Sequence, residues 1–275
     1  MSEAAQTLNH TPEYGRAATN TPEYGRAATN TPEYGRVVGV TTPQANTTVE
    51  PEMQCLLTGT VLTARLTSPF SDSRDRLLDY FDRLPATLAQ FDVAPVAAAG
   101  FACTGSCYLV GQEDEQRRLD LASQRLNYPV VSSAQAIRAA LAELGAKRIA
   151  LLSPYPKWLS EAGQQYWRDA GFTLVSAAGL PADLLDTRGI YRLTTERVLE
   201  VFNTLDTKDA DAVLMSGTGM PTLRALQQLD IGIPLLSSNL CLAWALDKAA
   251  GGAAAFGPWL AQDAGWRQRV TALSR

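Results

Sequence analysis

Histidine is almost absent from the 275 residues, because the only one is His10. Hydrolases with a Ser-His-Asp or Cys-His arrangement need an imidazole base, and zinc and iron sites take many of their ligands from histidine. Cysteine does not replace it, since the four cysteines contain no CxxC pair. The sequence therefore argues against both kinds of site and predicts a protein that uses no metal and no cofactor.

Long apolar runs and basic stretches are also missing. No apolar run approaches the ~18 residues that span a bilayer, and residues 1–36 have neither the basic start nor the apolar core of a secretory signal. With 24 Lys and Arg against 28 Asp and Glu, the chain has little to gain from contact with phosphate backbones. Its four scattered cysteines are too few for a disulfide framework. We expect a cytoplasmic protein with free thiols that binds neither membrane nor nucleic acid.

The N-terminal part of the chain is repetitive. Residues 11–30 contain two copies of TPEYGRAATN, and residues 31–36 begin a third. A ten-residue repeat rich in Thr, Pro, Gly and Asn shows no apolar periodicity and cannot bury a core. We predict that residues 1–36 form a disordered tail, and a binding role for the repeat stays open.

From Val37 onward, short apolar runs alternate with amphipathic stretches, which is typical of βα units and a parallel sheet. The remaining length is enough for two domains with separate cores. The predicted strands are Val37–Val40, Val61–Leu66, Val96–Gly100, Arg148–Leu152, Ala212–Met215 and Pro234–Ser237. The predicted helices are Asp72–Gln90, Glu113–Arg125, Ser133–Leu144, Lys157–Ala170, Thr194–Leu205, Pro221–Leu229 and Leu240–Ala249.

Two strand ends look like repeats of each other. AAAGFACTGS, Ala97 to Ser106, and DAVLMSGTGMPT, Asp211 to Thr222, each run from an apolar strand through a turn of small residues into a helix. Open α/β sheets bind ligands at the carboxyl ends of their strands, and the N–H groups of a helix start suit a carboxylate or an enolate. We therefore predict two similar half-sites that face each other across a cleft.

Three segments carry a resemblance to a known family: Thr42–Glu50, Cys103–Ser106 and Met220–Leu223. From about Val37 to Ala250 the chain resembles the Asp/Glu racemase superfamily, and within it maleate cis-trans isomerases and arylmalonate decarboxylases. The resemblance implies two pseudo-symmetric α/β domains with parallel, flavodoxin-like sheets and an active site in the cleft between them. We expect residues 37–131 and 239–275 to form the first domain and residues 132–238 the second.

The family usually places two cysteines, one from each half, beside the substrate carbon. Cys103 matches the first cysteine, but Gly217 stands where the second is expected. The resemblance further implies that Tyr155 and Asn46 bind substrate carboxylates. Another asparagine of the maleate isomerases is replaced near Asp186, which leaves the substrate open.

Cys103 lies at a strand-to-helix turn, where the helix N-terminus and nearby N–H groups are expected to lower the thiol pKa. Racemisation needs two acid/base groups, and Gly217 supplies none. Cis-trans isomerisation of a maleate-like dicarboxylate needs one nucleophile, which adds to the alkene and leaves after bond rotation. Decarboxylation of a substituted malonate needs one proton donor. We predict the isomerase, with the decarboxylase and a non-catalytic carboxylate-binding protein as alternatives.

Both reactions place negative charge on an oxyanion that needs hydrogen-bond donors. Simpler interpretations also stay open: a helix cap for Asn46, packing for Tyr155, capping of a helix by the segment around Asn239, turn geometry for the glycines, and core positions for the three other cysteines. The substrate is expected to be a small dicarboxylate, and a homodimer stays open. The predicted binding residues are Asn46, Thr104, Gly105, Ser106, Tyr155, Gly217, Thr218, Gly219 and Asn239.

Overall fold

The computed structural model describes residues 35–179, 186–252, 255–261 and 265–272, all within one compact unit that starts at residue 32. The predicted N-terminal tail therefore lies outside the described residues, except for Gly35 and Arg36. Among the residues described, no helix is both long and apolar enough to cross a membrane.

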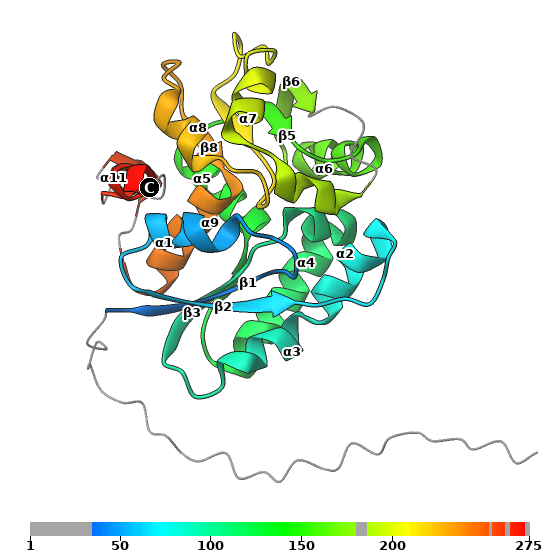
Figure 1. Ribbon diagram of the computed structural model, residues 1–275, viewed down its shortest axis with the longest axis vertical. Coiled ribbons are helices and arrows are strands. Elements are labelled where there is room, and N and C mark those ends of the chain that lie inside the picture. Colours follow the sequence, from blue (N-terminus) through cyan, green and yellow to red (C-terminus); the bar gives the residue numbers. More distant parts are fainter. Residues whose placement is uncertain (1–34, 180–185, 253–254, 262–264, 273–275) are drawn as a thin grey trace, which may run out of the picture. The chain divides into compact units, whose positions relative to one another are not determined.

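The described strands form two separate four-stranded sheets, each flanked by helices (Figure 1). All neighbouring strands in both sheets run parallel. Each sheet has the same order, with the second strand of the half at one edge and the first strand next to it, as in flavodoxin-like folds. The predicted α/β class with two pseudo-symmetric parallel sheets is thereby confirmed. The orders are β2 (Thr60–Leu66), β1 (Val37–Pro43), β3 (Val96–Phe101), β4 (Val130–Ser132), and β6 (Thr173–Gly179), β5 (Arg148–Ser153), β7 (Ala212–Met215), β8 (Leu235–Ser237).

Eleven α-helices and two short 3-10 turns accompany these strands in the part of the chain that is described. The helices are α1 (Val49–Leu56), α2 (Ser73–Asp82), α3 (Leu84–Leu88), α4 (Thr104–Leu126), α5 (Ser133–Glu143), α6 (Lys157–Asp169), α7 (Thr195–Phe202), α8 (Leu223–Gln228), α9 (Ser238–Ala249), α10 (Phe256–Ala261) and α11 (Trp266–Ala272), and the turns are η1 (Ala89–Phe91) and η2 (Thr187–Arg192).

The differences from the predicted elements have local causes. The unpredicted strands, β4 and β6, are edge strands; β4 has three residues, and no residue of β6 is buried. The predicted helix 72–90 is broken into α2, α3 and η1 close to Pro85, which cannot donate a helical hydrogen bond. The predicted helix 113–125 begins earlier, at Thr104, and is kinked at Gly111, where φ is +77°. Helices α1, α10 and α11 were not predicted.

The first sheet is held by close packing of small residues against large ones. All seven residues of β1 are buried, as expected for an inner strand of a parallel sheet. A Cβ at Gly39 would lie 2.4 Å from the Phe91 ring, and one at Gly100 would lie 3.1 Å from Leu246 of α9. Helix α9 follows β8 of the second sheet but packs against β3 and β4 of the first. This crossing ties the two halves together, while the domain boundaries stay a prediction.

A buried carboxyl group makes a second connection between the halves. Glu52, in α1, accepts the backbone N–H groups of Thr222 at 2.7 Å and Leu223 at 3.0 Å, at the start of α8. It also accepts the side-chain amide of Asn239, in α9, at 2.7 Å. Burial raises the pKa of Glu52, although these hydrogen bonds act in the opposite direction. The carboxyl group therefore stabilises the junction only because its partners compensate for its removal from water.

Replacing Glu52 by alanine is expected to destabilise the fold by about 3 kcal/mol, since the change leaves buried donors at the start of α8 without an acceptor. Glu50→Ala, in the same helix, is the matched control: its carboxylate is about a third exposed and pairs with Arg65, so the expected cost is below about 1 kcal/mol. Urea unfolding of both variants measures the difference. Equal losses of stability would contradict the bridging role of Glu52.

Candidate functional site

Cys103 is the residue that precedes α4, directly after β3. It is the N-cap of the helix, with φ −149° and ψ 87°, and is 4% exposed. Its Sγ lies 3.1 Å from Ser106 Oγ, and the backbone N–H groups of Gly105 and Ser106 at the start of α4 act to lower the pKa of the thiol. Ser106 Oγ donates to the Leu77 carbonyl at 2.6 Å, so in the thiol form Cys103 donates to Ser106. The first half-site therefore surrounds one sulfur with donors of the helix start.

The predicted lowering of the Cys103 pKa is wrong as a net effect. Burial raises the pKa of the thiol above its ordinary value, and this outweighs the lowering by Ser106, by the N–H groups of Gly105 and Ser106, and by the charge of Arg76. The N–H groups of the helix start do lower the pKa of Cys103, as predicted, but burial raises it by more. What the sequence did not reveal is how completely the turn is enclosed.

Thr218 joins the second half-site to the first. Its Oγ1 donates to the carbonyl of Ala102, the residue before Cys103, at 3.0 Å. The same oxygen accepts the side-chain amide of Asn46 at 3.4 Å. The ends of β1, β3 and β7 therefore meet at one point, which brings three predicted site residues, Asn46, Cys103 and Thr218, into one neighbourhood.

Asn46 also makes helix-capping contacts, as its simpler interpretation requires. Its Oδ1 accepts the N–H groups of Thr48 at 2.9 Å and Val49 at 3.3 Å, at the start of α1. Its carbonyl accepts a hydrogen bond from Arg65. These contacts fix the orientation of the side chain, so that its amide nitrogen points toward Thr218.

Tyr155 follows β5 and reaches across to the first half-site. Its hydroxyl is 2.6 Å from Thr104 Oγ1, and its ring packs edge-on against Tyr108, with centroids 6.0 Å apart. Tyr108 in turn is hydrogen-bonded to Ser216 and accepts the indole N–H of Trp167 at 3.1 Å. Burial raises the pKa of Tyr155, and nearby charge on Tyr108 and Cys103 would raise it further. Tyr155 therefore both packs against Tyr108 and makes a polar contact with Thr104.

Gly217 occupies a position that does not accommodate a side chain. Its φ is +144°, and a Cβ built on it would lie 2.8 Å from the Pro154 ring. Its N–H donates to Ser238 Oγ at 2.9 Å. Gly219 is similarly constrained, because a Cβ there would lie 2.6 Å from the Tyr191 ring. A positive φ and the Pro154 contact thus constrain Gly217, whereas at Gly219 the constraint is the Tyr191 contact.

Asn239, in α9, contacts the turn that contains Thr218. Its amide nitrogen donates to Glu52 and, at 3.0 Å, to the carbonyl of Thr218. Its Oδ1 is buried and has no partner among the described residues, as is also true of Thr42 Oγ1 at the end of β1. Asn239 therefore supports the Thr218 turn from behind, and no contact joins it to the Cys103 side in the part of the chain described.

Four residues near Cys103 were missed by sequence reasoning as site residues: Arg76, Tyr80, Asp186 and Tyr191. Arg76 is 1% exposed and donates to Asp186 at 2.5 Å. The pKa of Tyr80 is raised to about 12, mainly by burial and then by the charge of Cys103. Burial and Cys103 also raise the pKa of Tyr191. The only sequence signal was the departure from the family pattern near Asp186, because no motif marks the other three residues.

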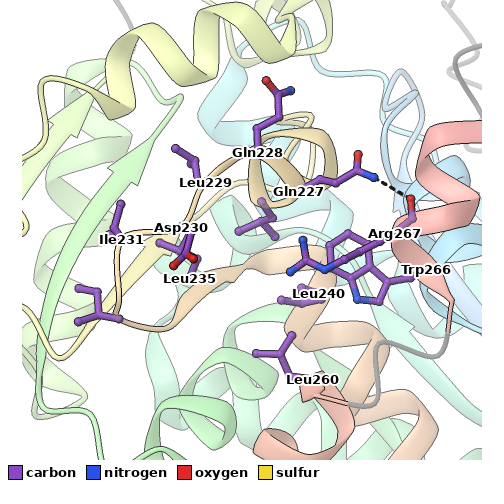
Figure 2. A pocket seen from close by; sticks show the side chains of 12 residues that line it. Gln227, Gln228, Leu229, Asp230, Ile231, Leu235, Leu240, Leu260, Trp266 and Arg267 are labelled. Atoms are coloured by element: carbon purple, nitrogen blue, oxygen red, sulfur yellow. Dashed lines mark hydrogen bonds between the residues drawn. The ribbon is translucent and has the colours of Figure 1, made fainter.

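A separate cavity of about 520 Å³ lies beside α8, β8, α10 and α11 (Figure 2). Leu235, Leu240, Leu260 and Trp266 line it, and Gln227 at its edge donates to the Arg267 carbonyl at 2.8 Å. None of the predicted site residues lines this cavity. This cavity is therefore separate from the candidate site at the meeting point of the strand ends.

Two parallel sheets of the same order define an α/β protein of two pseudo-symmetric halves. The candidate site lies where their strand ends meet, with a cysteine on one side and a glycine turn on the other. The arylmalonate decarboxylase family model matches residues 38–257, and the chain belongs to this family. It is an enzyme whose curated relatives are isomerases.

The maleate isomerase of Geobacillus stearothermophilus is 30% identical over 220 residues, which cover 73% of this chain and 86% of the relative. The maleate isomerase of Pseudomonas putida is 26% identical over 228 residues, covering 77% and 90%.

Solved structures show the same fold. A Pseudomonas putida maleate isomerase crystallised with maleate has a TM-score of 0.72 at 22% identity, covering 79% of this chain and 92% of the other. A Nocardia farcinica maleate cis-trans isomerase, a cysteine-to-serine mutant with a covalently bound succinylcysteine intermediate, has a TM-score of 0.70 at 24% identity, covering 79% and 93%. Arylmalonate decarboxylase has a TM-score of 0.61 at 18% identity, covering 79% and 94%.

Gly217→Ala is expected to destabilise the protein by roughly 2 kcal/mol, because alanine rarely adopts a positive φ and its Cβ meets Pro154. Gly111→Ala is the control, since Gly111 has a positive φ but nothing within 4 Å of the added carbon. Thermal or urea unfolding compares the two. A smaller loss at position 217 than at position 111 would mean that the Pro154 contact carries no cost.

Alkylation of Cys103 by iodoacetamide is expected to be slow at pH 7 and to accelerate as the pH rises past 9.0, the ordinary thiol pKa, because the pKa of this buried thiol is raised. Peptide mass spectrometry identifies the alkylated residue, with Cys103→Ala as the blank. A midpoint below 9.0 in the unmodified protein would contradict the raised pKa.

Proposed function

We propose that the protein is a cis-trans isomerase of a maleate-like dicarboxylate and that Cys103 is its nucleophile. The observation that carries the proposal is the position of Cys103, which is the N-cap of α4 and lies beside the hydrogen bond that joins the two halves. The similarity to maleate isomerases supports the choice of substrate class.

The reaction begins when the Cys103 thiolate adds to one alkene carbon. The electron pair of the double bond moves to the neighbouring carbon and onto its carboxylate, which becomes an enediolate. The former double bond is now single, so its two ends rotate, and expulsion of the thiolate yields the trans isomer. A raised pKa reduces the thiolate fraction but makes each thiolate a stronger nucleophile.

The groups around the sulfur suit the charges of such a substrate. The Asn46 amide and the Thr104–Tyr155 hydroxyl pair come from different elements and approach the end of β3 from two sides. Preorganised donors of this kind stabilise an enediolate more effectively than water, because they need not reorient as charge develops. Arg76 adds positive charge near the thiol, and its pairing with Asp186 keeps it in place.

Decarboxylation is the second candidate, because the matching family model is that of arylmalonate decarboxylase. In that reaction a thiol would protonate the enediolate left by carbon dioxide. The isomerase is favoured because maleate isomerases are the curated relatives that match the chain, at 26–30% identity.

Incubation with maleate is expected to produce fumarate, and Cys103→Ala should reduce the rate by roughly a thousandfold or more, as for loss of other catalytic nucleophiles. Proton NMR follows both isomers directly. Cys241→Ala is the matched control, because Cys241 is a buried core residue of α9; its activity should stay close to that of the unmodified protein.

Phenylmalonate is the competing substrate in the same experiment. Release of carbon dioxide that depends on Cys103, without any fumarate from maleate, would replace the isomerase by the decarboxylase. Absence of both products, at conditions where Cys103 is ionised, would favour a non-catalytic carboxylate-binding protein.

A further inference from the structure

The space beside Gly217 is filled from the neighbouring turn. A Cβ placed on Gly217 would lie 2.8 Å from the Pro154 ring and 3.6 Å from the hydroxyl oxygen of Tyr155. A side chain extending from position 217 would therefore point into the volume that Pro154 and Tyr155 occupy. Apart from the adjacent Ser216 and Thr218, the Tyr155 hydroxyl is the protic group nearest to that Cβ.

Two other hydroxyl groups of the half-sites have their protons committed. Ser106 donates to the Leu77 carbonyl and Thr218 to the Ala102 carbonyl. In the Tyr108–Ser216 pair, the Tyr108 oxygen is also occupied as the acceptor of the Trp167 indole N–H.

The Tyr155 hydroxyl, which lies beside position 217, pairs only with Thr104 among the described residues. One hydroxyl proton makes their mutual hydrogen bond of 2.6 Å, and either oxygen can be the donor. The second proton has no acceptor among the described residues. Because a phenol is far more acidic than an alcohol, proton release from this pair leaves the charge on Tyr155.

We propose that Tyr155 is the general acid and base of the isomerisation, taking the place of a second cysteine. This inference rests on the proposed function. After the thiolate has added, the Tyr155 pair transfers a proton to the enediolate carbon, which gives a succinyl thioether and a tyrosinate. After rotation, the tyrosinate removes a proton from the same carbon, the double bond re-forms, and the thiolate leaves. The number of protons and electrons on the enzyme is unchanged over one cycle.

The pKa of Tyr155 fits the return step. Burial raises this pKa, with the neighbouring Tyr108 and Cys103 acting in the same direction and Thr104 opposing them. The tyrosinate is consequently a strong base, as removal of a proton next to a carboxylate requires. Thr104, which shares the proton, is a positioning residue.

In heavy water, deuterium in the product reports the proton transfer, because the bond rotates between the two transfer steps. Before rotation, the solvent-derived deuteron on the carbon faces Tyr155, and its removal only regenerates maleate. Rotation that leads to the trans isomer turns the original hydrogen toward Tyr155 instead. The fumarate formed in heavy water is therefore expected to retain one deuteron per molecule, while maleate returned by direct reversal carries none.

The experiment compares the unmodified enzyme with Tyr155→Phe and the control Tyr128→Phe in heavy water, using NMR and mass spectrometry of fumarate. We expect labelled fumarate from the unmodified enzyme and from Tyr128→Phe. Tyr155→Phe should lower kcat by about a hundredfold or more, as loss of a general acid does, and any residual fumarate should be unlabelled.

Two outcomes would overturn the role of Tyr155 while leaving the isomerase intact: unlabelled fumarate from the unmodified enzyme, or fully labelled fumarate from Tyr155→Phe with only KM raised. The second result would make Tyr155 a binding residue. Absence of fumarate from the unmodified enzyme would instead overturn the proposed function, and this inference with it.

Discussion

The hydrogen bond from Thr218 to the Ala102 carbonyl holds the two halves of the site in register. Both groups are buried at the carboxyl ends of parallel strands, where the sheets no longer supply partners, and a buried carbonyl left unpaired would be costly. Because Cys103 follows Ala102 directly, the same bond sets the place of the sulfur. Asn46 and Asn239 add contacts to Thr218 from the first strand and from α9.

Features that depend on residues adjacent along the chain were predictable from the sequence. The apolar runs of the inner strands located both sheets, and the turns of small residues located Cys103 and Gly217 at strand ends. Residues brought close only by folding were not predictable: Arg76, Tyr80 and Tyr191 lie on α2 and η2, and nothing in their local sequence refers to Cys103. The edge strands β4 and β6 were not predicted, because short or half-exposed strands show little apolar pattern in the sequence.

The thiol pKa illustrates a second limit of sequence reasoning. A helix start is visible in a sequence, and its effect on a thiol has a known direction. Burial acts in the opposite direction and depends on side chains from distant segments, such as Leu77 and Leu159, which lie within contact distance of a Cβ built at Gly105. In Cys103 burial is the larger effect. The direction of the pKa shift of Cys103 therefore depends on the tertiary structure and is not visible in the local sequence.

The glycine at position 217 bears on which reaction one cysteine can support. A racemase must deliver a proton to the face opposite the one from which it took a proton, so it needs two groups on two sides. In cis-trans isomerisation the carbon itself turns, and the hydrogen to be removed is brought to the same group that delivered the first proton. One thiol and one acid/base on a fixed side are sufficient for that cycle. The Pro154 ring leaves no room for a second cysteine at position 217, and the cycle proposed for Cys103 and Tyr155 does not need one.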